Sequence, residues 1–213
     1  MHEIKKTQRC FNFSMETRAD SNNKGVIEGR AIVYDSPTDL GFFTEVIEKD
    51  ALKNTNMKDV RLLVNHDTSM IPLARSRNNN ENSTLQLIPD DKGLRMKAKL
   101  DVENNSDAKN LYSAIERGDI TGMSFMFTIK GENWEDEDTD HPTRRITDIE
   151  QVFEISAVTF PAYEDTEINA RCKEELESFK NALESARAKS LESEKRDDDI
   201  ELIKLKNKIL GGI

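Results

Sequence analysis

The amino-acid sequence predicts an α+β fold in which short strands outnumber helices. From residue 26 onward, apolar or alternating runs follow one another at short intervals, separated by turn-forming residues. One internal segment has the apolar spacing of a helix, and a second helical pattern begins after residue 170, where the composition changes. We therefore expect a lead-in of residues 1–25, a folded domain of residues 26–170 and a helical tail of residues 171–213.

Strand segments are predicted where β-branched residues cluster or where apolar and polar residues alternate. In chain order they are Val26–Tyr34, Val60–Val64, Thr84–Ile88, Leu94–Leu100, Met123–Ile129 and Val152–Phe160, with a short strand at residues 11–15 in the lead-in. Residues 89–93 (PDDKG) contain the turn residues that join two of these strands as a hairpin. Residues 132–140 form an acidic loop.

The internal helix is predicted from its caps and its stripe. Ser106 or Asp107 can cap the amino end, and Gly118 can end the helix. Its apolar stripe consists of Ala108, Leu111, Tyr112 and Ile115. In the tail, Glu174–Leu210 contains no proline or glycine, and apolar residues recur at helical spacing. We expect this amphipathic helix to dock on a partner or to pair with another copy of the chain.

Charge and hydropathy exclude several classes of protein. The 213 residues include 31 Lys and Arg against 41 Asp and Glu, a net charge of −10. A nucleic-acid partner is not expected, because binding phosphates requires a basic surface. A membrane span is not expected either, since no run of about 18 apolar residues occurs, and no apolar stretch of the kind found in secretory signals follows the amino-terminal basic residues. Cys10 and Cys172 have no metal-ligand spacing and fit a reducing compartment.

His66 is the strongest candidate for proton transfer among three histidines. His2 lies in the lead-in, and His141 follows the acidic loop. His66 lies just after the predicted strand Val60–Val64. A strand end is rigid on one side and open on the other, which suits a group that transfers protons. A histidine with an ordinary pKa of about 6.5 can accept and return a proton near neutrality. A histidine that only completes a turn gives the same local pattern.

Two polar residues lie inside strands that otherwise look buried. Ser124 is a small hydroxyl among bulky apolar residues, and it either bonds nearby backbone or points into a cleft. Glu154 lies in the middle of Val152–Val158, where an unpaired carboxylate would be costly to bury. Glu154 therefore either lies on an edge strand and faces water or orients an imidazole, as in a catalytic triad.

Metal binding and cysteine chemistry have weaker support. Asp136, Asp138 and Asp140 have the first three spacings of a calcium loop, but His141 and Thr147 stand where that loop needs glycine and glutamate. A solvated acidic loop is the better interpretation. Cys10 is not favoured as a nucleophile. We expect no metal and no cofactor.

Several separate blocks, in order, resemble the prohead protease family of tailed phages. They are Gly29–Tyr34, Phe43–Ile47, Asp50–Leu52, Leu63–Asp67, Ile71–Arg75, Asp91–Leu94, Gly118–Phe125 and Glu154–Ala162. The resemblance covers roughly residues 25–170. Ala74 departs from it, because glycine is common there in the family, and the acidic loop is unusually long.

The resemblance implies a fold and a set of catalytic residues. The family is similar to herpesvirus assemblins, so it implies a compact, mostly antiparallel β-barrel with a few flanking helices. It further implies a serine endopeptidase in which His66 is the general base, Ser124 the nucleophile and Glu154 the third member of the triad. His141 and Asp67 compete with Glu154 for that third position, since the herpesvirus relatives use a second histidine.

The resemblance also implies a biological setting. The expected substrates are the scaffold and the amino-terminal segment of the major capsid protein during procapsid maturation, with the chain itself as a further candidate. The enzyme would work inside the assembling procapsid in the host cytoplasm, and the tail would bind scaffold, be cleaved off, or support a homo-oligomer. The alternative function is a catalytically silent assembly or scaffold module that uses the same fold to bind capsid protein.

Overall fold

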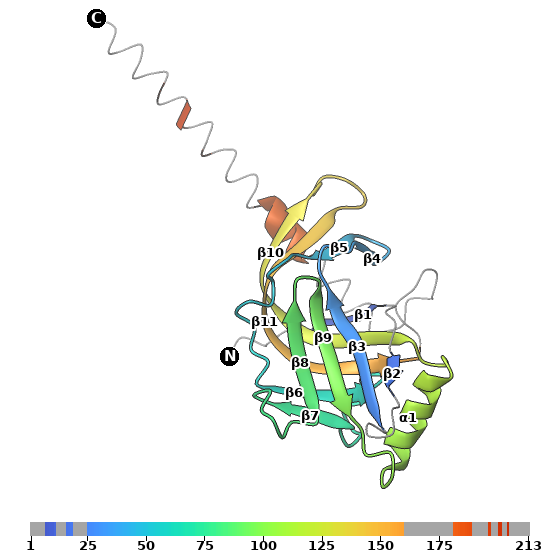
Figure 1. Ribbon diagram of the computed structural model, residues 1–213. Helices are drawn as coiled ribbons and strands as arrows, with labels where there is room; N and C mark the ends of the chain where they lie inside the picture. Colours follow the sequence, from blue (N-terminus) through green and yellow to red (C-terminus); the bar gives the residue numbers. More distant parts are fainter. Residues whose placement is uncertain are drawn as a thin grey trace, which may run out of the picture. The chain divides into compact units, whose positions relative to one another are not determined.

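Two β-sheets and an internal helix account for most of the chain that the structure, a computed structural model, describes (Figure 1). The described residues are 7–11, 16–18, 25–159 and 181–188, together with the helical positions Arg196, Ile200, Glu201 and Lys204. Strands predominate, and the helices are few. The fold is therefore α+β with mainly β structure, as the alternating runs predicted.

The first sheet has seven strands and is built around β10 and β11. Its main path runs in the order β1 (Thr7–Phe11), β10 (Gly122–Glu135), β11 (Thr143–Val158), β5 (Thr44–Ile47) and β4 (Thr38–Asp39). Beside this path, β6 (Asp59–Val64) pairs with β11, and β7 (Ala74–Arg77) pairs with β6. The pairs β1–β10, β4–β5 and β6–β7 are antiparallel, whereas β6 runs parallel to β11.

The second sheet has four antiparallel strands in the order β2 (Glu16–Arg18), β3 (Val26–Val33), β9 (Gly93–Lys99) and β8 (Leu85–Asp90). The predicted hairpin at residues 89–93 is confirmed, because Asp90 pairs with Gly93 at the turn between β8 and β9. Gly93 has a φ of 136°, and a Cβ there would lie 2.0 Å from the carbonyl oxygen of Ile32. Only glycine fits this approach of β9 to β3.

The described strands do not form the single closed barrel that the family resemblance implied. They divide into two sheets, and neither sheet is closed by the pairings of its described strands. The physical reason lies in β11, which is 16 residues long and pairs with β10, β5 and β6. A strand has only two edges, so at least two of these partners share one edge at different positions, and the sheet branches.

Helix α1 (Ser106–Glu116) occupies the predicted segment, but its cap lies one residue earlier than expected. The extended backbone of Asn105 lets its side-chain oxygen accept hydrogen bonds from the amides of Asp107 and Ala108, at 2.9 and 3.2 Å. Ser106 is already helical. At the other end, the amide of Gly118 donates to the carbonyl of Ile115 at 3.0 Å, so the predicted end is confirmed.

One cluster of buried apolar side chains joins both sheets and α1. It includes Ile27 and Met96 from the second sheet, Phe125 and Ile155 from the first, and Leu111 from α1. Burial of apolar side chains of this size contributes roughly 1.5–3 kcal/mol each before the cost of ordering the chain. This core fixes the ends of β10 and β11 from which the polar residues described below project.

The chain divides into two units, Met1–Asn133 with Arg144–Thr166, and Trp134–Thr143 with Glu167–Ile213. In the second unit, residues 181–188 are helical, and the guanidinium of Arg187 donates to the carbonyl of Glu137 at 2.8 Å. Most of the predicted tail, residues 171–213, lies outside the described residues. Of the lead-in, β1 and β2 belong to the sheets, and the predicted strand at residues 11–15 lies mostly outside the described residues. Within the described part of the chain, no helix is long and apolar enough to cross a membrane.

Candidate active site

The parallel pairing of β6 with β11 determines which residues meet. Arg61 lies opposite Glu154, and Val64 lies opposite Ala157. The pairing continues by one bond beyond β6, because the amide of Asn65 donates to the carbonyl of Ala157 at 2.9 Å. Strands that run parallel end at the same edge of their sheet. The turn that follows β6 therefore lies against the last residues of β11.

His66 lies in that turn with an unusual backbone. Asn65 and His66 have φ values of 50° and 58°, so two successive residues adopt the left-handed conformation. Asparagine and histidine tolerate it better than most residues. The Asn65 side chain ties the turn to β11: its Nδ2 donates to Thr159 Oγ1 at 3.1 Å, and its Oδ1 accepts from the Thr159 amide at 2.9 Å. These two hydrogen bonds hold the turn in which the His66 side chain is only 8% exposed.

Three of the predicted residues form one hydrogen-bonded chain. Ser124 Oγ lies 2.5 Å from His66 Nε2, and His66 Nδ1 lies 2.5 Å from Glu154 Oε1. The three residues come from β10, from the turn after β6 and from β11. Ser124 is 0% exposed and the Glu154 side chain 4% exposed, so the chain of bonds is shielded from water. Such shielding strengthens interactions between charged and polar groups.

The position of Ser124 follows from the sequence of β10. Met123, Phe125 and Phe127 are all fully buried, and the Phe125 and Phe127 rings stack with centroids 4.7 Å apart. These large side chains fix the strand in the core. Ser124 lies between two of them. The sequence left open whether its hydroxyl bonds nearby backbone or points into a cleft; in the structure the hydroxyl contacts the His66 ring.

Glu154 is buried and bonded rather than on a solvated edge. Its Oε1 faces His66, and its Oε2 accepts a hydrogen bond from Ser156 Oγ at 2.6 Å. Of the two competitors for the third position, Asp67 is bonded within its own turn. Asp67 is exposed and accepts from the hydroxyl and the amide of Ser69 at 2.6 and 2.9 Å, which keeps the pKa of Asp67 below its ordinary value. His141 is exposed and belongs to the second unit.

Sequence reasoning missed the residues that support this chain of bonds. Ser156, two residues after Glu154, donates to Glu154 and accepts from the backbone amide of His66 at 3.1 Å. Asn65 and Thr159 fix the turn. A signal for Ser156 was present, since residues i and i+2 of a strand share a face. A serine in an apolar strand is too common for that signal to stand out.

The structure supplies no metal centre among the residues it describes. No group of three or more His, Cys, Asp or Glu side chains is arranged to hold an ion in that part of the chain. The carboxylates of Asp136, Asp138 and Asp140 are exposed at the turn between β10 and β11. The calcium-loop spacing therefore has no matching cluster in the fold.

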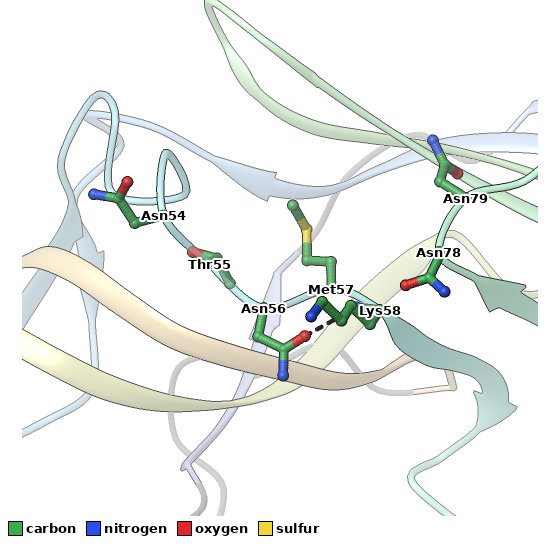
Figure 2. A pocket seen from close by; sticks show the side chains of 7 residues that line it. All are labelled: Asn54, Thr55, Asn56, Met57, Lys58, Asn78 and Asn79. Atoms are coloured by element: carbon green, nitrogen blue, oxygen red, sulfur yellow. Dashed lines mark hydrogen bonds between the residues drawn. The ribbon is translucent and has the colours of Figure 1, made fainter.

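A surface hollow lies away from the bonded residues and has a structural explanation. Figure 2 shows its lining, which includes four asparagines and none of His66, Ser124 and Glu154. Asn56 Oδ1 accepts from the Lys58 amide at 3.1 Å. Asn79 exchanges two hydrogen bonds with the backbone of Leu87, at 2.8 and 3.0 Å. These hydrogen bonds give Asn56 and Asn79 a structural role in holding the loops.

A serine whose hydroxyl contacts an imidazole, itself paired with a carboxylate, is the arrangement found in serine hydrolases. The class is established by comparison with known families: the model of the caudovirus prohead serine proteases matches residues 13–182, and the chain belongs to that family. The protein is therefore a serine protease of phage capsid maturation, which acts on capsid protein within the assembling procapsid in the host cell. No curated protein and no solved structure matches the chain.

Proposed function

We propose that Ser124, His66 and Glu154 form the catalytic triad of an endopeptidase that cleaves the scaffold, the amino-terminal segment of the major capsid protein, or both, and that also cleaves its own chain. The observation that carries this proposal is the continuous bond chain from Ser124 Oγ through the His66 ring to Glu154 Oε1. Its order is that required for acyl transfer.

In the proposed mechanism, His66 Nε2 accepts the proton of Ser124 as Oγ attacks a peptide carbonyl. The imidazole then carries a positive charge, which the Glu154 carboxylate stabilises through Nδ1–H. The same proton is returned to the leaving amine, and water repeats the sequence to release the acyl group. Proton transfer by a positioned base contributes roughly 10²–10⁴-fold to such a reaction.

Access to the nucleophile is restricted in the described conformation. Ser124 is 0% exposed, and neither partner side chain is more than 8% exposed. A peptide carbonyl reaches Oγ only after part of the covering chain moves. We therefore propose that the free enzyme is restrained, and that binding of a substrate segment, from capsid protein, scaffold or a peptide, opens the site.

The test compares wild type with Ser124→Ala and with Ser76→Ala. Ser76 is the matched control, because it is equally buried and its hydroxyl accepts only a local bond from the Asn79 amide at 3.2 Å. Intact mass is followed over time, first for the chain alone and then with capsid protein and scaffold. We expect fragments with wild type and Ser76→Ala and none with Ser124→Ala. Equal fragmentation with Ser124→Ala would point to a contaminating protease or to a different nucleophile.

A second experiment addresses residues 171–213. We propose that residues 171–213 bind scaffold and carry the enzyme into the procapsid. Deleting them should leave hydrolysis of a peptide substrate unchanged and abolish incorporation into procapsids. Undiminished incorporation would refute the role of the tail and leave the triad untouched.

A further inference from the structure

Ser156 connects two members of the proposed triad without touching the nucleophile. Its Oγ donates to Glu154 Oε2 at 2.6 Å and accepts from the backbone amide of His66 at 3.1 Å. The residue is 0% exposed. Glu154 and Ser156 are two apart on β11, so both side chains leave the same face of the strand.

The two bonds of Ser156 fix the direction of its proton. A hydroxyl has one proton to donate, and a backbone N–H group can only donate. Because the His66 amide supplies the proton in one bond, the proton of Ser156 is available for the other, toward Glu154. Ser156 therefore requires an acceptor at the atom that it faces. In wild type that atom is Oε2, and Oε1 remains for His66 Nδ1.

We propose that Ser156 is a positioning residue that sets the hydrogen-bonding polarity of the triad. This inference rests on the triad proposed above. Ser156 orients the Glu154 carboxylate, holds the backbone of His66 beside it, and so keeps an acceptor oxygen against Nδ1. Nδ1 then carries the proton, and Nε2 is left free to accept the proton of Ser124.

The consequence is a specific prediction for Glu154→Gln. The amide of glutamine has one acceptor and one donor end. Ser156 requires the acceptor end, so the side chain turns its NH₂ toward His66 Nδ1. Nδ1 must then accept, the ring proton moves to Nε2, and Nε2 cannot take the proton of Ser124. Removing the hydroxyl with Ser156→Ala frees the glutamine to turn its oxygen back toward Nδ1.

The experiment measures kcat and KM for wild type, Ser156→Ala, Glu154→Gln, the double variant and the Ser76→Ala control, on a peptide that wild type cleaves. We expect Ser156→Ala to lower kcat by about tenfold with little change in KM, and Ser156→Thr, which keeps a hydroxyl, to recover most of it. Glu154→Gln should lower kcat further. The double variant should then be about tenfold more active than Glu154→Gln alone. A purely structural Ser156 gives a double variant weaker than either single variant, and that result would overturn the proposal.

A spectroscopic readout does not depend on turnover. The chain has three histidines, so ¹⁵N-histidine labelling gives three ring systems, and the His66 signals are assigned by their loss in His66→Gln. Spectra are recorded well above pH 6.5, where an ordinary imidazole is neutral, in the Ser124→Ala background to prevent self-cleavage. We expect the ring proton on Nδ1 in that background, on Nε2 after Glu154→Gln, and on Nδ1 again in combination with Ser156→Ala.

Failure of the inference and failure of the triad give different results. If cleavage persists in Ser124→Ala, the triad itself is wrong. If Ser124→Ala is inactive but Ser156→Ala behaves like Ser76→Ala in kcat and Glu154→Gln keeps the ring proton on Nδ1, the triad stands and the role of Ser156 is refuted. Thermal unfolding of every variant identifies any loss caused by misfolding.

Discussion

The turn that holds His66 should depend on the side chain of Asn65, and the structure allows the effect to be estimated. Asn65 makes two hydrogen bonds to Thr159, at 2.9 and 3.1 Å, and has a φ of 50°. Asn65→Ala removes both bonds. At an exposed site each contributes about 0.5 kcal/mol, the lower end of the usual range. Alanine also pays about 1–2 kcal/mol for the left-handed conformation.

The expected loss for Asn65→Ala is therefore about 2–3 kcal/mol, which lowers the melting temperature of a chain of this length by roughly 4–12 °C. Asn65→Asp is the matched control. Aspartate keeps the acceptor for the Thr159 amide, can accept from the Thr159 hydroxyl, and tolerates a positive φ. Its expected loss is below about 0.5 kcal/mol.

Two assays separate stability from positioning. Thermal unfolding is measured in the Ser124→Ala background, so that self-cleavage cannot lower the transition. Peptide hydrolysis is measured with Ser124 present, at a temperature where all variants are folded. We expect kcat to fall by on the order of 10–100-fold for Asn65→Ala, because a displacement of about 1 Å in a catalytic group can cost 10²-fold, and to stay near wild type for Asn65→Asp.

Two outcomes would refute this reasoning. Equal melting temperatures for the alanine and aspartate variants would mean that neither the two bonds nor the backbone conformation contributes. A destabilised Asn65→Ala with an unchanged kcat would mean that Asn65 supports the turn but does not position His66.

Two further predictions concern the second sheet. Arg30 binds Asp90 through two hydrogen bonds, at 2.5 and 2.8 Å, and this keeps the pKa of Asp90 at about 2 against an ordinary 3.8. A carboxyl whose folded pKa is lowered stabilises the fold above its unfolded pKa and loses that contribution as pH falls through the folded pKa. We expect the free energy of unfolding to fall by about 1 kcal/mol between pH 4 and pH 2, after discounting for solvent. In Arg30→Met the free energy of unfolding, measured with urea, should change less with pH in that range; an unchanged pH dependence would contradict the pairing. Gly93→Ala should lower the free energy of unfolding by roughly 3 kcal/mol or more, since its Cβ would lie 2.0 Å from the Ile32 carbonyl oxygen. Gly41→Ala is the control: Gly41 has a φ of 84° but nothing within 4 Å of its Cβ position, so the loss should be only about 1–2 kcal/mol. Equal losses in urea unfolding would contradict the close approach.

Local patterns predicted most elements of the fold but not all of their ends. The predicted strand Met123–Ile129 continues in the structure to Glu135, into the segment expected to be an acidic loop. The alternation of apolar residues stops at Ile129, but ion pairs continue between the two strands: Lys130 with Asp148 at 2.9 Å, and Glu132 with Arg144. A search for apolar alternation cannot detect a strand whose partners are charged.

Strand pairing was beyond the reach of local patterns. Parallel pairing of β6 with β11 joins residues about 90 positions apart, as in the bond between His66 and Ser156. The sequence of neither segment identifies its partner strand, because alternation indicates which residues are buried and not which strands pair. The barrel was inferred from the family resemblance and not from the residues. The branching of the first sheet at β11 could not be predicted from the alternation of apolar residues.

The individual site residues illustrate the same limit. His66, Ser124 and Glu154 each had an ordinary structural explanation, and only their order within the family blocks singled them out. Their proximity in the structure is independent of that resemblance, because it follows from register and core packing. Ser156 lay inside the last family block without any role assigned to it, since its importance depends on the backbone amide of a residue 90 positions away.

The support of the proposed triad is concentrated in one strand. β11 supplies Glu154 and Ser156, and the residue just beyond it, Thr159, holds the turn of His66. Because side chains alternate along a strand, a slip of one residue between β6 and β11 would move Glu154 and Ser156 to the opposite face relative to His66. A slip in β1, which pairs with the edge of β10 that faces away from β11, would leave these bonds in place. The geometry of the site therefore depends on the registers of β11 with its neighbours β6 and β10, and not on the pairing of β1.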